Sequence, residues 1–253
     1  TSGTFTGSSA FNKLTLSPTL SSTGKTYTFG SGAIETTSDF TINPSATALA
    51  LTVNMGANIT VGATATTTIT RASTATSVLD LRPSSTDYNL STGHLDIKTG
   101  GTLDGTGSAS TITLTGTDTS GILFSRTGTF TAGSTEVIMN PASGVTLTSG
   151  TFIDSNAFNR LTLSPTLSGS IVYTFGTGVA STTGDFTINP SSGGVNLLAV
   201  SMAADIDVAI GATTTISRTG SALSALDLRP AATDYNLSTG HLSIGSGGTL
   251  DGG

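Results

Sequence analysis

Three observations predict an all-β protein folded as a parallel β-helix (β-solenoid), with little or no α-helix. The chain repeats itself over a long period, and apolar residues alternate with polar ones in short segments. A proline closes each of seven such segments. Alternation with period two places apolar side chains on one face of a strand, and a long array of short strands is typical of a solenoid.

The long repeat defines the domain organisation. TSGTF begins at Thr1 and again at Thr148, 147 residues later. The two sequences continue to match after this point: FNKLTLSPTL corresponds to FNRLTLSPTL, and DFTINPS is present twice. We therefore expect residues 1–147 to form a first solenoid unit, and residues 148–253 to form a second, incomplete copy that continues it.

The prolines mark the expected corners of the solenoid. Proline cannot donate a hydrogen bond to a sheet ladder, so it suits the turn that follows a strand. The shortest proline spacings, 24 and 26 residues, suggest coils of 20 to 25 residues and hence about 11 to 12 coils in all. The predicted corner residues are Pro18, Pro44, Pro83, Pro141, Pro165, Pro190 and Pro230.

The alternation predicts which side chains fill the core. Threonine or another polar residue separates the apolar residues, as expected of strands with one buried face. Eight of the ten phenylalanines also pair across the repeat: Phe5/Phe152, Phe11/Phe158, Phe29/Phe175 and Phe40/Phe186. The inward pairs are expected to be Leu14/Leu16, Phe40/Ile42, Ile59/Val61, Leu79/Leu81, Leu95/Ile97 and Ile112/Leu114.

Composition excludes several classes of protein. Charged residues make up only 9% of the chain, while threonine and serine make up about a third of it. The nine Lys and Arg residues are scattered and the net charge is −6, which argues against nucleic acid as a partner. Apolar runs are too short for membrane insertion, and the absence of cysteine excludes disulfides and thiolate chemistry. With no initiator Met and no signal peptide, the chain is expected to be a mature piece or an excerpt of something longer.

The sequence of the repeat resembles that of a known class of proteins. The stretch GTFTAGSTEVIMNPASGVTLTSGTF and the segments after it (128–163) resemble the β-strand repeats of very large bacterial cell-surface and extracellular fibres. Those proteins are similar to filamentous-haemagglutinin and autotransporter-passenger β-helix adhesins. The resemblance covers essentially the whole chain. It implies a secreted or surface-displayed fibre and brings no catalytic residues.

One polar cluster is a candidate active site. The stretch LDLRPSSTDYNLSTGHL (79–95) combines Asp80, Arg82, Asp87, Tyr88 and His94, and it returns almost unchanged at 226–242. Alternation predicts that the Asp80 and Arg82 side chains point outward as a surface ion pair, and that the imidazole of His94 also points outward. No second and third carboxylates are expected nearby on stacked coils, so acid–base chemistry is disfavoured.

Weaker candidates are calcium and glycan sites. Asp104 and Asp251 lie in GGTLDG, which has some likeness to calcium-binding glycine-rich repeats but lacks their GGxGxD order. Both are weak calcium candidates. The acidic pair in ADIDVAI, at 205 and 207, is expected to be surface variation, because the first copy has neutral residues there. The N-x-S/T triplets, expected to occur by chance, begin at Asn58, Asn89 and Asn236.

The sequence therefore predicts a non-enzymatic structural segment of an extracellular or cell-surface fibre or adhesin, with no cofactor. Its expected partners are copies of itself, end to end or bundled, with surface glycans or another cell as further partners. One alternative is a carbohydrate-binding or carbohydrate-cleaving β-helix. A second is an ice-binding β-solenoid, suggested by threonine-rich strands but disfavoured because irregular proline spacings argue against aligned threonines.

Overall fold

The computed structural model describes residues 4–5, 9–116, 122–141, 144–148, 157–176, 178 and 180–253. Two compact units make up the chain. Unit 1 comprises residues 1–116 and 125–135, and unit 2 comprises 117–124 and 136–253. Strand β15 (Ile122–Arg126) contributes residues to both units.

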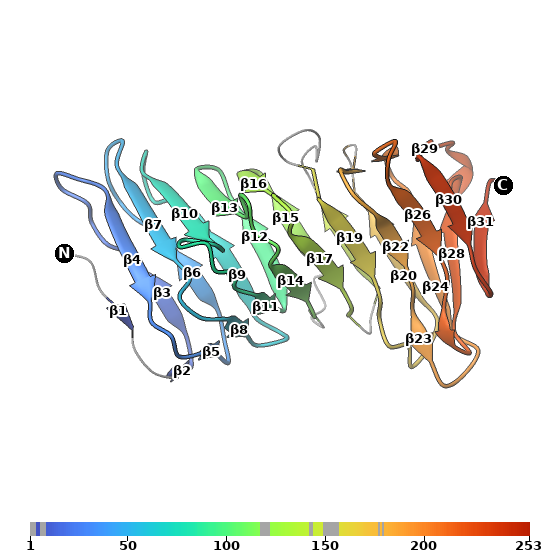
Figure 1. The fold of residues 1–253 in the computed structure, drawn as a ribbon, viewed down its shortest axis with the longest axis horizontal. Coiled ribbons are helices and arrows are strands. Elements are labelled where there is room, and N and C mark those ends of the chain that lie inside the picture. Colours follow the sequence, from blue (N-terminus) through green and yellow to red (C-terminus); the bar gives the residue numbers. More distant parts are fainter. Residues whose placement is uncertain are drawn as a thin grey trace. The chain divides into compact units, whose positions relative to one another are not determined.

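Unit 1 is a three-walled parallel solenoid, because the chain visits three sheets in turn and then returns to the first (Figure 1). The first wall contains β1 (Thr4–Phe5), β4 (Lys25–Phe29), β7 (Ala50–Asn54), β10 (Thr76–Asp80), β13 (Gly101–Asp104) and β16 (Thr129–Thr131). The second wall contains β2 (Ser9–Phe11), β5 (Ile34–Thr36), β8 (Ile59–Val61), β11 (Leu90–Thr92) and β14 (Thr111–Leu114). The third wall contains β3 (Leu14–Leu16), β6 (Phe40–Ile42), β9 (Thr66–Ile69) and β12 (His94–Ile97).

Unit 2 is built in the same way, with parallel pairing between successive turns. One of its walls contains β17 (Glu136–Met139), β19 (Arg160–Leu163), β22 (Phe186–Ile188), β26 (Thr213–Ile216) and β30 (His241–Ile244). Another contains β18 (Val145–Thr148), β20 (Ile171–Phe175), β24 (Leu197–Ser201), β28 (Leu223–Asp227) and β31 (Gly248–Asp251). Shorter strands complete it: β21 (Ala180–Thr182), β25 (Ile206–Val208) and β29 (Leu237–Ser238), with β23 (Ser191–Ser192) beside β27 (Thr219–Gly220).

The predicted fold class is confirmed, but the predicted number of coils was too high. Among the described residues the only helical element is one 3-10 turn, η2 (Pro230–Ala232). Partner residues on adjacent turns are 22 to 31 positions apart, the shortest step joining Leu90 to Ile112 and the longest joining Ile59 to Leu90. Many of these steps exceed the expected 20 to 25 residues, so 253 residues form fewer coils than the 11 to 12 expected.

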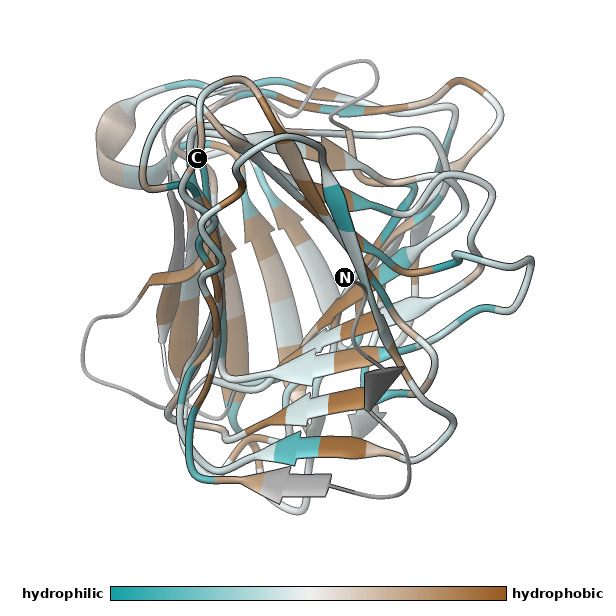
Figure 2. Ribbon diagram, turned by 90° about the vertical axis from the view of Figure 1, so that its left-hand side faces the viewer, coloured by the Kyte–Doolittle hydropathy of each residue, from teal (hydrophilic) through white to brown (hydrophobic). Residues whose placement is uncertain are grey.

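The interior is filled by the inward side chains of the strands. Hydrophobic segments alternate with paler, more polar ones along the ribbons in Figure 2. All six predicted inward pairs are buried. Of the phenylalanines paired across the repeat, five are at most 4% exposed, while Phe152 lies outside the described residues. The five are Phe29, Phe40, Phe158, Phe175 and Phe186.

Prolines lie at corners, two or three residues beyond the end of a strand. Pro18 follows β3 in this way, and Pro83 follows β10. The carbonyl oxygen of Pro18 accepts a hydrogen bond of 3.0 Å from the amide of Ser45 on the next turn. A corner proline therefore still takes part in the stacking of turns, through the acceptor that it retains.

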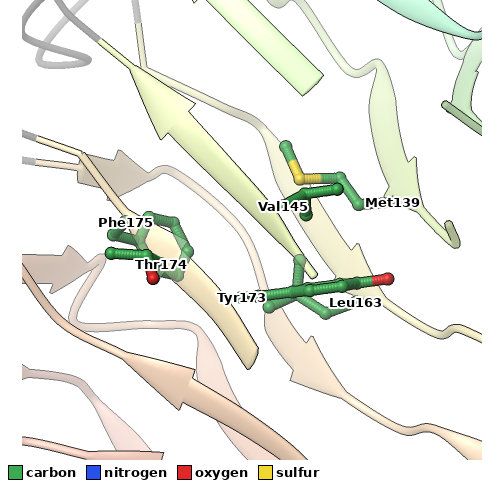
Figure 3. A pocket seen from close by; sticks show the side chains of 6 residues that line it. All are labelled: Met139, Val145, Leu163, Tyr173, Thr174 and Phe175. Atoms are coloured by element: carbon green, nitrogen blue, oxygen red, sulfur yellow. The ribbon is translucent and has the colours of Figure 1, made fainter. Parts of the chain in front are cut away.

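Unit 2 contains a small apolar gap of about 10 Å³ beside Tyr173 (Figure 3). The phenol is almost fully buried, and its hydroxyl donates a hydrogen bond of 2.6 Å to the carbonyl oxygen of Pro141. Burial raises the pKa of this hydroxyl far above its usual range. The gap has the volume of roughly one solvent molecule, so we interpret it as imperfect packing.

Candidate functional site

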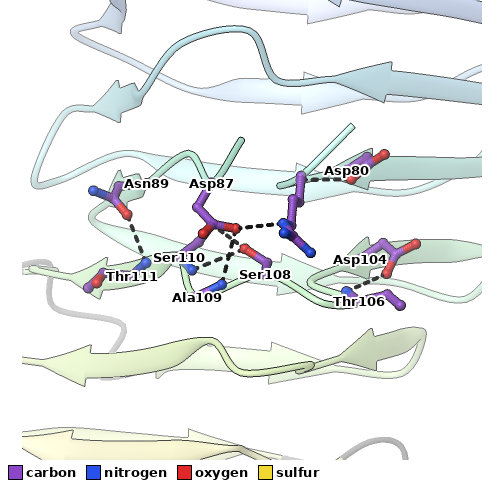
Figure 4. Close-up of polar contacts among 10 residues, drawn as sticks. Asp80, Asp87, Asn89, Asp104, Thr106, Ser108, Ala109, Ser110 and Thr111 are labelled. Carbon is purple, nitrogen blue, oxygen red and sulfur yellow. Dashed lines mark hydrogen bonds and ion pairs between the residues drawn. The ribbon is translucent and has the colours of Figure 1, made fainter. Parts of the chain in front are cut away.

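The polar cluster of the first copy lies at one corner of unit 1, next to the end of β10 (Figure 4). The Asp80 carboxylate accepts a hydrogen bond of 2.8 Å from the backbone amide of Arg82, two residues later. This is the usual turn made by an aspartate side chain with its own backbone. The predicted ion pair between Asp80 and Arg82 was therefore wrong, because the Asp80 carboxylate caps the backbone instead.

Arg82 forms its ion pair with Asp87, at 3.2 Å between Nε and Oδ1. The same Asp87 oxygen accepts a hydrogen bond of 3.1 Å from the backbone amide of Ala109 on the next turn. Asp87 thus connects two turns through Ala109 (Figure 4), while it also holds the Arg82 guanidinium. Both side chains are about one-third exposed, so the charge pair itself contributes under about 1 kcal/mol.

The second copy of the cluster repeats part of this geometry. Arg229 pairs with Asp234 at 3.0 Å, and the backbone amide of Arg229 donates to Asp227 at 2.9 Å. The Asp234 side chain is 85% exposed, so the ion pair and the aspartate cap are repeated, whereas the link to a next turn belongs to Asp87 of the first copy. A pair and a cap that form twice have the properties of a corner element that the repeat reuses.

Two asparagines of the N-x-S/T triplets, Asn58 and Asn89, connect turns through their side-chain oxygens. Asn58 Oδ1 accepts a hydrogen bond of 2.9 Å from the amide of Asn89, whose own Oδ1 accepts one of 2.8 Å from the amide of Thr111. In the second copy Asp205 replaces Asn58 and accepts the amide of Asn236 at 2.8 Å. The change from Asn to Asp at this position therefore conserves the acceptor. Asp207 is exposed.

His94 does not point outward as predicted. It is 6% exposed and occupies the start of β12, where both His94 and Leu95 are buried. Gly116 of the next turn lies against the imidazole, since a Cβ on Gly116 would be 2.5 Å from His94 Cε1. Strand alternation fails here because the residue lies at a corner, where the next turn covers the imidazole. Its equivalent His241 is exposed.

A buried pair of threonines supports this corner, and sequence reasoning missed it. Thr67 donates a hydrogen bond of 2.9 Å to the hydroxyl of Thr92, which donates one of 2.9 Å to the carbonyl oxygen of His94. Both threonines are fully buried. The second copy repeats the chain of bonds from Thr214 through Thr239. An inward threonine paired with another threonine 25 residues later was the available signal.

The structure also brings two carboxylates together that sequence reasoning kept apart. Asp80 and Asp104 are partners in the register of β10 and β13, on adjacent turns of the same wall. Asp227 and Asp251 are partners in the same way. Burial raises the pKa of the Asp80 carboxyl, the hydrogen bond from the Arg82 amide lowers it, and the charge of Asp104 raises it.

These carboxylates serve the backbone. Asp104 accepts a hydrogen bond of 2.9 Å from the amide of Thr106, and Asp251 accepts one of 3.0 Å from the amide of Gly253. Within the described part of the chain, no group of three or more His, Cys, Asp or Glu residues is placed to hold a metal ion. The arrangement is a ladder of turns with stacked negative charge, which costs stability when both groups are ionised.

Asp80→Asn is expected to stabilise unit 1 at neutral pH by about 0.2–1 kcal/mol. The amide keeps an oxygen that can accept the Arg82 backbone N–H, and it removes the repulsion with Asp104. An asparagine, Asn54, already occupies the register position before Asp80. Because the folded-state pKa of Asp80 is raised, the folded protein binds the proton more tightly, and ionisation destabilises it. Chemical denaturation at a series of pH values measures the difference.

The stability gained by Asp80→Asn should depend on pH. The advantage of Asp80→Asn should be complete above the raised pKa and should vanish as the pH falls below the ordinary pKa of aspartate. Asp207→Asn is the control, because Asp207 is exposed and should change stability by less than about 0.5 kcal/mol. A loss of stability in Asp80→Asn at neutral pH would contradict the interpretation.

Comparisons with known proteins identify no relative of this chain. No family model, no curated protein and no solved structure matches the chain. A search of the described residues for helices that could span a membrane finds none of sufficient length and apolarity. The contacts of the described residues define a parallel β-solenoid in which the acidic corner side chains accept backbone amides.

Proposed function

We propose that this chain is a non-enzymatic structural segment of a bacterial surface or extracellular fibre, and that it stacks end to end with copies of itself. One observation carries the proposal. The last turn of unit 2 exposes apolar side chains whose equivalents in unit 1 are buried by a further turn. Such a surface is the expected docking site for another turn of the same kind.

The exposed surface, which we call the end face, includes Leu242 and Ile244 of β30. They are 45% and 48% exposed, while their equivalents Leu95 and Ile97 are 1% and 0% exposed. Leu237 belongs to the same end face and is half-buried.

The repeat itself indicates what covers such a surface. In unit 1 the equivalent of Leu237 is Leu90, which is fully buried and pairs with Ile112 on the next turn. Unpaired strand edges are ready to add a parallel strand from another chain. A second copy of this chain supplies turns with the same strand spacing and pattern of inward residues. We therefore propose that a further turn of the same repeat covers the end face, and that a second copy of this chain can supply that turn.

Self-association tests the proposal. The wild-type chain should associate with increasing concentration in sedimentation experiments and should form thin filaments in electron micrographs. Leu242→Glu combined with Ile244→Glu should weaken association at least about tenfold. Association would then bury two carboxylates where the wild-type chain buries two apolar side chains. Both residues are exposed in the single chain, so the variant should retain its fold by circular dichroism.

Two other exposed apolar residues provide the matched control. Val172 and Val195 are 48% and 77% exposed and lie in β20 and in the turn before β24, and β28 separates β24 from the last strand, β31. Replacing both by glutamate should leave association unchanged. A wild-type chain that remains monomeric at every concentration and appears as compact particles would overturn the proposal, and so would equal weakening by the two double variants.

The alternative of a carbohydrate-cleaving β-helix gains one feature, the paired carboxylates Asp80 and Asp104. Each of them accepts a backbone amide in its own turn. General acid–base catalysis requires carboxylates aimed at a bound substrate. No observation favours that use here.

The alternative of an ice-binding face also gains one feature. Irregular coil lengths do not prevent alignment, since Thr26 pairs with Thr52 and Thr102 pairs with Thr129 on the first wall. Val78 interrupts this column, and the neighbouring column contains Asp80. The array is therefore narrow and partly charged, and no observation favours ordered water on it.

A further inference from the structure

An open polar groove of about 520 Å³ lies on unit 1, at the corner where the chain leaves β9, β12 and β15. Residues of three successive turns line it, and the stacking of these turns sets their positions. Its lining includes Arg71, Ser73, Asp96, Lys98, Ser125 and Thr127. The volume lies within the range of about 300–1,000 Å³ that is usual for sites of small ligands.

The guanidinium of Arg71 is fixed in position within this groove. Its side chain lies directly over Gly100 of the next turn, because a Cβ on Gly100 would be 2.3 Å from Arg71 Cδ. Gly100 has a φ of +81°, which favours glycine for a second reason. Within the described part of the chain, the guanidinium donates one hydrogen bond, at 3.5 Å to the carbonyl oxygen of Ala75. Most of its five N–H donors remain for a ligand.

The second charged element of the groove is the pair formed by Lys98 and Asp96, 3.3 Å apart. Lys98 is 55% exposed and Asp96 is 25% exposed at the side chain, so both are accessible. With Arg71 they make the groove net positive, in a chain whose formal net charge is −6. The remaining lining is rich in hydroxyl groups of serine and threonine, which both donate and accept hydrogen bonds.

We propose that this groove binds an acidic saccharide, a polyhydroxylated ligand that carries a carboxylate. A planar guanidinium recognises a carboxylate through two parallel hydrogen bonds. The hydroxyls of the lining, with the Asp96 carboxylate, match the hydroxyls of a sugar ring. The groove is open and polar and has no aromatic residue in its lining, which suits a uronate better than an apolar ligand or a stacked neutral sugar.

The second copy supplies a natural comparison. Arg218 lies over Gly247 as Arg71 lies over Gly100, and it donates a hydrogen bond of 3.2 Å to Ala222. The positions of Asp96 and Lys98, however, are occupied by Ser243 and Gly245. The corner itself therefore does not require the charged pair. A role in ligand binding accounts for charges that the architecture leaves optional, and it does not depend on the fibre proposal.

Titration of the chain with a galacturonate tetrasaccharide tests the inference. Calorimetry measures the affinity, and the NMR signals of the backbone amides in the isotope-labelled chain locate the binding site. Saturable binding is expected, with shifts confined to residues 70–73, 96–99 and 125–127. The variant Asp96→Ser/Lys98→Gly installs the residues of the second copy and should reduce affinity at least tenfold. Its thermal stability should stay close to that of the wild type, because the exposed pair contributes little.

Three comparisons keep the test decisive. Lys13→Ser removes an exposed lysine outside the groove, 57% exposed at its side chain, and should leave affinity unchanged. Raising the salt concentration should weaken binding, since the carboxylate contact is partly screened. The inference is overturned by an absence of saturable binding, by equal affinity in Asp96→Ser/Lys98→Gly, or by equal affinity for a neutral glucose tetrasaccharide.

Discussion

Gly93→Ala is expected to lower the free energy of unfolding by at least about 3 kcal/mol, because there is no room for a methyl group between two turns. A Cβ at this position would lie 2.4 Å from the carbonyl oxygen of Ala63 and 2.6 Å from that of Ala65. The Ala65 oxygen accepts a hydrogen bond of 2.9 Å from the amide of His94. The backbone cannot move aside without breaking this bond between turns.

Chemical denaturation, monitored by circular dichroism, measures the effect. Two further variants provide a parallel case and a control. Gly240 is the equivalent position in unit 2, where a Cβ would lie 1.9 Å from the carbonyl oxygen of Ile210, so Gly240→Ala should be similarly damaging. A Cβ at Gly211 would have no atom within 4 Å. Gly211→Ala should be neutral or slightly stabilising, by up to about 1 kcal/mol. Equal effects at Gly93 and Gly211 would contradict this account of turn stacking.

The strands and their buried faces could be predicted because they depend on local information. Period-two alternation places Leu14 and Leu16 inward whatever the neighbouring turn contains, and both are buried. The fold class follows from the same alternation combined with the long repeat. Corner residues are different. His94 was predicted to be exposed and is buried, because the turn above it covers the corner, and alternation carries no information about that turn.

The number of coils and the register could not be predicted from proline spacing. The step between partner residues varies from 22 to 31 residues, and corners absorb the difference while the strands stay aligned. The expectation that irregular spacing prevents alignment of threonines was wrong for this reason. Thr26 and Thr52 are partners across one step, and Thr102 and Thr129 are partners across another.

The chemistry of the polar cluster depended on the same missing register. The sequence shows Asp80 and Asp104 as 24 residues apart, and only the pairing of β10 with β13 places them on adjacent turns. The exchange of partners around Arg82 was hidden in the same way, since Asp87 is positioned by the amide of Ala109 on the next turn. Acidic side chains in this solenoid are used largely as acceptors for backbone amides, and the doubled cluster is explained by that use.

Phe40→Ala is expected to cost about 3–5 kcal/mol, the usual range for removing a fully buried phenylalanine ring. Phe40 is 0% exposed and lies between Leu14 and Thr67 in the stack of turns. Its ring centroid is 6.0 Å from that of Phe29, at an angle of 57°. The narrow core of a solenoid turn offers few side chains that could shift to fill the resulting cavity. Denaturation by urea gives the total loss, with Val195→Ala as an exposed control expected to stay within about 0.5 kcal/mol.

The location of the damage tests the solenoid more sharply than its size. Each turn contacts only its neighbours, so the loss of amide hydrogen-exchange protection in Phe40→Ala should be greatest in β3, β6 and β9 and should decline with distance along unit 1. Phe186, whose ring centroid is 6.0 Å from that of Phe175, is the equivalent residue in unit 2. Phe186→Ala should weaken β19, β22 and β26 instead. Uniform loss of protection throughout the chain in both variants would mean that it unfolds as one cooperative block, and nearest-neighbour stacking would then be an incorrect description of its stability.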